Sequence, residues 1–295
     1  MKQKILVSVD TEGPAGKHPV ERLIYGKTAD GEFGIKYLMR LFDQHGAKGL
    51  FFVDIAEAWD YGRNRIEDVL HTVTQGGHDT GVHVHPEHMA DKNRRYLWQY
   101  SYEEQYEMIA RCTEIYCKSL KKFPLSFRAG RYSANNDTMA VLSKLGYKYD
   151  MSSFYGNRYC KLRLPCSYNK MISIDKLDLK EVPVTSFKSF ENYFYRRFDK
   201  IDCSMDFREF KRVMEKIFVL DSVDVVSFFV HSFSVLDWRR QPDRPKLSRK
   251  YNRRLLEELD WLSDHRHTRF ISEADLDGIK CCHASGGGGR SVCFA

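Results

Sequence analysis

The chain has 295 residues, of which 42% are hydrophobic and 14% aromatic, and its formal net charge is +7. This composition excludes an intrinsically disordered chain and allows a core that buries about three quarters of the unfolded surface. The basic residues form no long block, so we expect no nucleic-acid partner. No apolar run approaches the about 20 residues of a membrane span, so we expect no integral membrane segment.

The first residues and the cysteines bear on the cellular compartment. Residues 1–4 lead directly into an apolar segment, without the pattern of a secretory signal. The eight cysteines are scattered and lack the spacing of a disulfide framework, and free thiols are the default in a reducing compartment. We therefore expect a cytoplasmic protein. The sequence sets no oligomeric state.

Residues 5–150 alternate between strand and helix patterns. Strands are expected at 5–10, 48–54, 80–84, 127–131 and 147–150, and helices at 34–45, 66–74, 102–120 and 136–145. This order is typical of a mostly parallel sheet or barrel with helices outside. Functional side chains of such folds gather at the carboxyl ends of the strands. Four polar residues lie at or near such ends, namely Asp10, His83, Arg128 and Asp150.

The second half is less regular. Within 155–215 we expect strands at 171–174 and 179–184 and an aromatic-basic segment at 190–198, as an excursion that shapes the substrate cleft. A helix at 207–217, an apolar strand at 223–231, a helix at 250–263 and a strand at 268–272 follow. Residues 281–295 are rich in glycine and are expected to form a flexible tail after a single domain of residues 1–280.

A cluster of histidines is the strongest chemical signal. Residues 78–88 contain four of the eleven histidines, at His78, His83, His85 and His88. Imidazole is the commonest metal ligand among side chains. The first strand ends in Asp10-Thr-Glu12, and alternation along a strand places residues i and i+2 on one face. Two carboxylates and a histidine cluster together predict a metal-dependent hydrolase.

The motifs resemble, in their order, those of the polysaccharide deacetylase superfamily, the NodB-homology or carbohydrate esterase family 4 proteins. Gly-His-Asp-Thr-Gly-Val-His at 77–83 is similar to the family's Gly-His-Glu-Ile-Gly-x-His. Phe-Arg-Ala-Gly-Arg at 127–131 resembles its arginine motif, 145–150 its Gly-Tyr-x-x-Asp segment, and Phe-Val-His-Ser at 229–232 its final Leu-x-x-His. The resemblance covers about residues 3–275.

The resemblance implies a distorted (β/α)7 barrel of the NodB-homology type, which is an α/β fold. It also implies one divalent metal ion, for which we expect Zn²⁺, and a water that attacks an N-acetyl carbonyl. Asp10 would be the general base, and Glu12 the metal carboxylate. The family's usual first motif is two adjacent aspartates, whereas this chain has the Asp-x-acid variant of outlying branches. The reversed assignment of Asp10 and Glu12 therefore stays open.

His83 fits the first histidine ligand of the family, but the second is ambiguous. The family spaces its ligands as His-x-x-x-His, and the residue four positions after His83 is Glu87. His88 fits with a slip of one residue, and we prefer it on family geometry. His85 is the alternative, because His-x-His-Pro also occurs in branches of the family. In either case three ligands leave a coordination position open for water.

The remaining roles follow from the same resemblance. His231 would protonate the leaving amine as general acid, Arg128 would orient the base, and Asp150 would tune the acid histidine. The expected reaction removes an N-acetyl group from a sugar, as in an intermediate of surface-polysaccharide assembly. The aromatic and basic residues at 193–197 would suit a nucleotide- or lipid-linked sugar. Two alternatives are a hydrolase of a non-sugar amide, cyclic imide or ureide, and a non-catalytic carbohydrate-binding relative.

Overall fold

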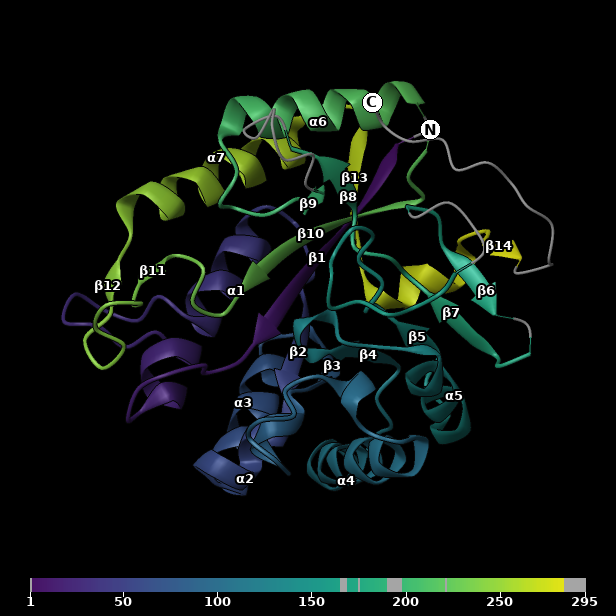
Figure 1. Ribbon diagram of the computed structural model, residues 1–295. Helices are drawn as coiled ribbons and strands as arrows, with labels where there is room; N and C mark the ends of the chain where they lie inside the picture. The colour runs from purple at the N-terminus through teal and green to yellow at the C-terminus, as the bar shows by residue number, and fades with distance from the viewer. Residues whose placement is uncertain (1, 165–168, 175, 190–197, 221, 284–295) are drawn as a thin grey trace.

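A large sheet forms the centre of the molecule, with helices around it (Figure 1). The computed structural model describes residues 2–164, 169–174, 176–189, 198–220 and 222–283. Ten strands make up this sheet: β1 (Gln3–Thr11), β2 (Leu50–Asp54), β3 (Asp79–Val84), β4 (Ser126–Ala129), β5 (Tyr149–Asp150), β6 (Ile172–Ile174), β7 (Leu179–Glu181), β10 (Val225–His231), β13 (Thr268–Ile271) and β14 (Cys282–His283).

The strands follow the order β10-β1-β2-β3-β4-β5-β7-β6-β14, and all neighbours are parallel except β6 and β7. β10 pairs with β1 from Lys4 to Asp10. β13 pairs with the first half of β1 and β2 with its second half. The sheet curls into a partial barrel with helices outside it (Figure 1), which confirms the predicted α/β barrel.

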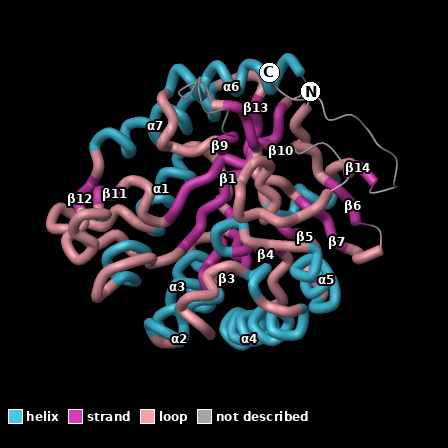
Figure 2. The backbone as a smooth tube through the Cα atoms, viewed as in Figure 1, coloured by secondary structure: helices cyan, strands magenta, loops and turns pink. Residues whose placement is uncertain are grey.

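Seven α-helices and several short helical turns cover the sheet in the described part of the chain. The α-helices are α1 (Ile35–Gln44), α2 (Ala58–Tyr61), α3 (Arg63–Gln75), α4 (Tyr102–Leu120), α5 (Asn136–Leu145), α6 (Phe207–Leu220) and α7 (Arg249–Asp264). The short turns are η1 (Val20–Ile24), η2 (Ile55–Glu57), η3 (Pro86–His88), η4 (Leu97–Gln99), η5 (Gly130–Tyr132) and η6 (Glu273–Gly278). Figure 2 shows the helices outside the strands, with α6 and α7 together at the top. None of these helices is long and apolar enough to cross a bilayer.

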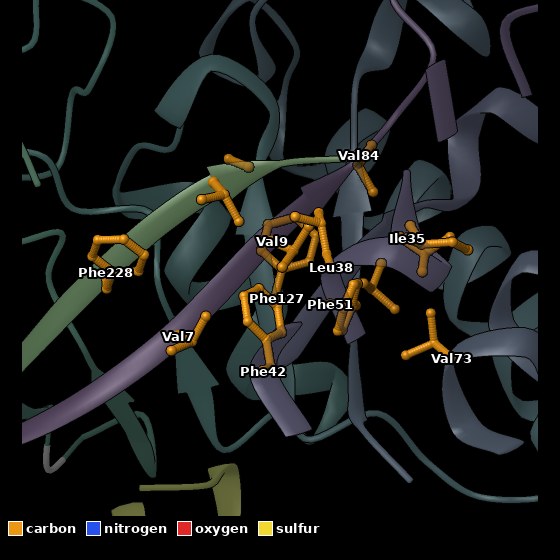
Figure 3. Close-up of a cluster of buried hydrophobic side chains, with 14 of the residues drawn as sticks. Val7, Val9, Ile35, Leu38, Phe42, Phe51, Val73, Val84, Phe127 and Phe228 are labelled. Carbon is orange, nitrogen blue, oxygen red and sulfur yellow. The ribbon is translucent and has the colours of Figure 1, made fainter. Parts of the chain in front are cut away.

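The core lies between the sheet and its helices (Figure 3). On α1 the spacing of three and four residues places Ile35, Leu38 and Phe42 on one buried face. This face packs with side chains from the strands, including Phe51 and Phe127. Each fully buried side chain of this size contributes about 1.5–3 kcal/mol. The core fixes the strands, and the strands fix the site at their carboxyl ends.

The second half departs from the simple strand-helix alternation. β6 and β7 form an antiparallel pair that continues the sheet, and β8 (Ser186–Lys188) and β9 (Phe198–Lys200) form a separate two-stranded ladder. A further small ladder joins β11 (Leu236–Asp237) and β12 (Lys246–Leu247). The strand β14 pairs with β6, so the folded part extends to residue 283, beyond the predicted end at 280. The aromatic-basic residues at 193–197 and the Gly-rich residues at 284–295 lie outside the described residues.

Candidate active site

The carboxyl ends of the strands bring the predicted site residues to one edge of the sheet. Asp10 at the end of β1 is the register partner of His231 at the end of β10. His83 near the end of β3 is the register partner of Arg128 in β4. Glu12 follows β1 directly, and its carboxylate lies between the histidines of these strands.

Glu12, His83 and His85 form a group of three potential metal ligands, which we call the Glu12 site. One ligand atom from each lies within 4.8 Å of the other two. Glu12 Oε2 is 2.8 Å from His85 Nε2 and 3.6 Å from His83 Nε2. Burial alone would raise the pKa of Glu12, but His85, His83 and His231 hold that pKa well below its usual value. Glu12 is therefore anionic at neutral pH.

The ring of His83 is oriented for metal binding through Nε2. Its Nδ1 lies 2.8 Å from the backbone oxygen of Arg128, and a carbonyl oxygen can only accept a hydrogen bond. Nδ1 therefore carries a hydrogen, and Nε2 is the ring nitrogen that faces Glu12. Metal-binding histidines are commonly oriented by a hydrogen bond of this kind.

His85 is held by two residues that the sequence analysis did not select, Glu87 and Arg131. Arg131 Nη1 lies 2.7 Å from His85 Nδ1 and 2.6 Å from Glu87 Oε1. Arg131 and Tyr132 both have a left-handed backbone, with φ of 54° and 58°. Such conformations are costly for residues other than glycine and concentrate at functional sites. This backbone turn directs the guanidinium of Arg131 toward His85.

Asp10 and Arg128 form a buried ion pair beside the Glu12 site. Arg128 Nη1 donates to Asp10 Oδ1 at 2.7 Å, while Nη2 donates to Ser8 Oγ and Nε to the backbone oxygen of Met151. The guanidinium has no solvent exposure, and it lies over the ring of Phe52. The second oxygen of Asp10 faces His83 Nε2 at 3.8 Å.

His231 lies on the other side of Glu12, with Nε2 3.8 Å from Glu12 Oε1. Its ring stacks on Phe233 and meets Phe229 edge-on. Burial lowers the pKa of His231, against the opposing effect of Glu12 and Asp10. Two further charged groups act on this ring, Lys200 and Asp202, which form an ion pair of 2.8 Å. They belong to the region around β9, where the sequence offered no motif.

Three of the singled-out residues lie apart from the Glu12 site. Asp150 accepts a hydrogen bond from Ser152 and is the register partner of Glu181, and burial raises the pKa of Asp150 to about 6. The charges that act on His231 come instead from Glu12, Asp10 and the Lys200–Asp202 pair. His88 groups with Asp54 and Glu57, so His85 rather than the preferred His88 stands beside Glu12 and His83. His78 accepts a hydrogen bond from the backbone N–H of Gly49 and packs in the core.

Some residues near the site were not predicted, and only some of them have a recognisable pattern in the sequence. Asp54 ends β2, so the strand-end rule that selected Asp10 applies to it as well. Glu57 lies only three residues further on. Lys200 and Asp202 reach the site through a β-bridge between Asp202 and Phe229, and no local pattern signals that contact.

Part of the chain matches a known protein family in sequence. Residues 30–149 match the family model described as polysaccharide deacetylase. This segment includes His83, His85 and Arg128, and it leaves out Asp10, Glu12 and His231. No curated protein is similar enough in sequence to count as a match.

Solved structures resemble the chain at the level of the fold. A protein of Mycobacterium smegmatis assigned as a polysaccharide deacetylase is 13% identical, with a TM-score of 0.63, over 94% of this chain and 89% of its own. One of Pseudomonas aeruginosa PAO1 with the same assignment is 13% identical, with a TM-score of 0.56, over 92% and 89%. The PuuE allantoinase is 12% identical, with a TM-score of 0.57, over 92% and 88%. The family model therefore places a polysaccharide deacetylase signature in residues 30–149, and the solved structures show that the chain shares their barrel fold.

Proposed function

We propose that the protein is a metal-dependent hydrolase that removes an N-acetyl group from a sugar, in the manner of a biosynthetic step on a surface polysaccharide. The observation that carries this proposal is the arrangement around Glu12. A set of one carboxylate and two imidazoles stands between the ion pair of Asp10 with Arg128 and the ring of His231. A hydrolase needs a metal site, a base and an acid, and the site has a candidate for each.

The side chains of the Glu12 site fit a divalent ion. Glu12 supplies an anionic oxygen, and His83 presents Nε2 because its Nδ1 donates to a backbone oxygen. One oxygen and two nitrogens form a set that Zn²⁺ and similar ions accept, and three protein ligands are typical of catalytic zinc sites. A divalent ion held there would act as a Lewis acid on the acyl oxygen and make water more acidic.

The protein groups around that ion have separable tasks. Asp10 Oδ2 faces the ligand set, so Asp10 is placed to accept the proton of the attacking water. Arg128 fixes the other oxygen of Asp10 and so sets the direction of the base. His231 stands on the opposite side of Glu12 and is placed to give a proton to the leaving nitrogen. We do not assign Asp150 the tuning of His231, because its carboxyl bonds Ser152 and faces Glu181.

A cavity is separated from the Glu12 site by aromatic side chains. The cavity, of about 250 Å³, is bordered by Phe154 and Tyr155. Phe154 meets the ring of Tyr132 edge-on, and Tyr132 contacts Phe229, the neighbour of His231. One layer of aromatic side chains therefore separates this cavity from the proposed acid. Aromatic side chains beside a polar site are suited to hold a sugar ring.

A second candidate function keeps the same metal site and changes the substrate to a cyclic imide or ureide. The observation in its favour is the likeness in fold to an allantoinase, at a TM-score of 0.57. The two functions differ in product. A de-N-acetylase releases acetate, whereas an imide or ureide hydrolase opens a ring without releasing a second molecule.

The first test combines metal analysis with product analysis. We expect the wild type to release acetate from N-acetylglucosamine oligomers when loaded with Zn²⁺. Replacement of His83 by alanine should abolish both metal at the Glu12 site and acetate release. The matched control is His71→Ala, which alters an exposed histidine on α3. Ring opening of hydantoin or allantoin without acetate release would favour the second function. Full metal loading without either activity would contradict both functions and leave a carbohydrate-binding protein.

A further inference from the structure

A second group of potential metal ligands adjoins the Glu12 site. Asp54, Glu57 and His88, which we call the Asp54 cluster, each offer one ligand atom, and these atoms lie within 4.8 Å of one another. Asp54 ends β2, Glu57 ends the turn η2, and His88 ends the turn η3. The two groups share a structural link, because the backbone N–H of His85 donates to Asp54 Oδ1 at 3.3 Å.

Each carboxylate of the Asp54 cluster has one oxygen held by the backbone and one without a hydrogen bond. Asp54 Oδ1 accepts from the N–H groups of Ala56 and His85, and Glu57 Oε1 accepts from the N–H of Gly13. Asp54 Oδ2 and Glu57 Oε2 accept no hydrogen bond from the described residues. Asp54 is 0% exposed and Glu57 1% exposed, so solvent does not satisfy these oxygens either. A buried acceptor without a partner is costly, which points to a missing positive partner.

His88 is oriented as a ligand in the same way as His83. Its Nδ1 lies 2.7 Å from Asp60 Oδ2, and that carboxylate is also bound by Lys92 at 2.6 Å. Because a carboxylate accepts this hydrogen bond, Nδ1 carries a hydrogen, and Nε2 is the ring nitrogen that faces the cluster. Nε2 lies 3.9 Å from Asp54 Oδ2, one of the two oxygens without a hydrogen bond. A carboxylate behind a histidine that faces further ligands is the usual outer shell of a metal site.

The local electrostatics also favour a cation at this position. Burial raises the pKa of both Asp54 and Glu57. The negative charge of Asp54 raises the pKa of Glu57 further. The groups that oppose this repulsion around Asp54 are the histidines His85, His88 and His83. A divalent ion among the three ligands would neutralise both carboxylates at once.

We propose that the Asp54 cluster binds a second divalent cation, separate from the ion of the Glu12 site. Two carboxylates and one imidazole favour a cation that accepts hard oxygen ligands with nitrogen, such as Mn²⁺ or Zn²⁺. The ion would fix the carboxylates that hold the backbone of Gly13, next to Glu12, and of His85. This inference goes beyond the proposed hydrolase activity and does not depend on it.

The test counts bound metal in the full chain after removal of metal by a chelator and equilibration with Mn²⁺ or Zn²⁺. We expect two equivalents in the wild type, and one each in Asp54→Asn and in His83→Ala. The double variant should bind none. With Mn²⁺, electron paramagnetic resonance should show magnetic coupling between two ions in the wild type and an isolated ion in each single variant. Asp264→Asn, at the exposed end of α7, is the matched control and should keep two equivalents.

Two results would overturn the second site. One is a single equivalent in the wild type at saturating Mn²⁺ that Asp54→Asn retains and His83→Ala loses, and the other is full retention of two equivalents in Asp54→Asn. If Asp54→Asn fails to fold, as judged by circular dichroism, His88→Gln replaces it, because His88 is only half-buried. Loss of one equivalent in the Asp54→Asn variant but none in His83→Ala would support the Asp54 cluster and contradict the Glu12 site. The two proposals therefore fail in different ways.

Discussion

Arg128 shows how much the site depends on one buried side chain. It is fully buried, and its guanidinium donates to Asp10, to Ser8 and to the backbone of Met151. Breaking a buried ion pair by removing one partner costs about 3–5 kcal/mol, because the other charge stays buried without compensation. Arginine at this position thus supports both the fold and the orientation of the proposed base.

Replacement of Arg128 by methionine should therefore lower the free energy of unfolding by about 3–5 kcal/mol and strongly lower kcat. Urea denaturation measures the first and acetate release the second. Addition of Asp10→Asn to Arg128→Met should cost less than the sum of the two single changes, because the pair is already broken. Strict additivity would contradict a direct pairing. Arg253→Met changes an exposed arginine on α7 and should alter stability by no more than about 0.5 kcal/mol.

The sequence alone could not decide whether His85 or His88 lies beside Glu12 and His83. Alternation along an extended segment places His83 and His85 on the same side, and the structure has both rings beside Glu12. Family spacing favoured His88, but Pro86 begins a tight turn that carries His88 toward Asp60. The direction of that turn depends on contacts with α2, which lies far away in the sequence.

Among the elements, α7 carries an acidic residue in an apolar setting. Glu258 is 0% exposed, and neither of its carboxyl oxygens accepts a hydrogen bond from the described residues. Burial raises the pKa of Glu258 from 4.5 to about 9, and the neighbouring Asp202 adds to this effect. The carboxyl is therefore neutral in the folded protein at neutral pH and ionised in the unfolded chain.

This difference makes stability depend on pH. Between pH 4.5 and about 9 the folded state keeps a proton that the unfolded state releases. The contribution of Glu258 to the free energy of unfolding is thus complete below its unfolded pKa of 4.5. It is lost as the pH rises through about 9, and the free energy of unfolding falls by about 1.4 kcal/mol per pH unit over this range. Glu258→Gln should remove this slope from unfolding free energies measured by urea at pH 6 and pH 8. Glu257→Gln, at a more exposed position, is the control. An unchanged slope in Glu258→Gln would contradict the raised pKa.

Elements with strong local signals were predictable, and elements made by distant contacts were not. For α4, the expected and observed bounds agree at both ends, and Ser101 and Glu104 form a capping box at its start. By contrast, no strand was expected at β8, β9 or β14, which are three or fewer residues long, and β14 exists through pairing with a strand about 110 residues earlier. Such short strands carry too little periodicity to be recognised, because their hydrogen-bond partners alone define them.

For the whole molecule, metal should act as a stabilising ligand of the folded state. The ligands of the Glu12 site lie at or just after the carboxyl ends of β1 and β3, so only the folded chain brings them together. A free metal concentration of 100 times Kd at one site would add about 2.7 kcal/mol to the free energy of unfolding. We expect Zn²⁺ to raise the Tm of chelator-treated protein, as measured by calorimetry.

The response to Zn²⁺ should be absent from a double variant that lacks one carboxylate of each site, Glu12→Gln with Asp54→Asn. Each single variant should keep part of it. An equal rise of Tm in the double variant would show that the stabilisation comes from metal bound elsewhere, such as surface histidines.

The pairing of β1 has a consequence for the order in which a newly synthesised chain can fold. The partners of β1 are β2, which is made early, and β10 and β13, which are made among the last 71 residues. A nascent chain that ends near residue 150 can pair only Ser8 to Thr11 of β1, and one edge of that apolar strand stays open. The ribosome must therefore make the chain as far as residue 231 before Asp10 meets His231, and chaperone binding to the first strand would protect it during that interval.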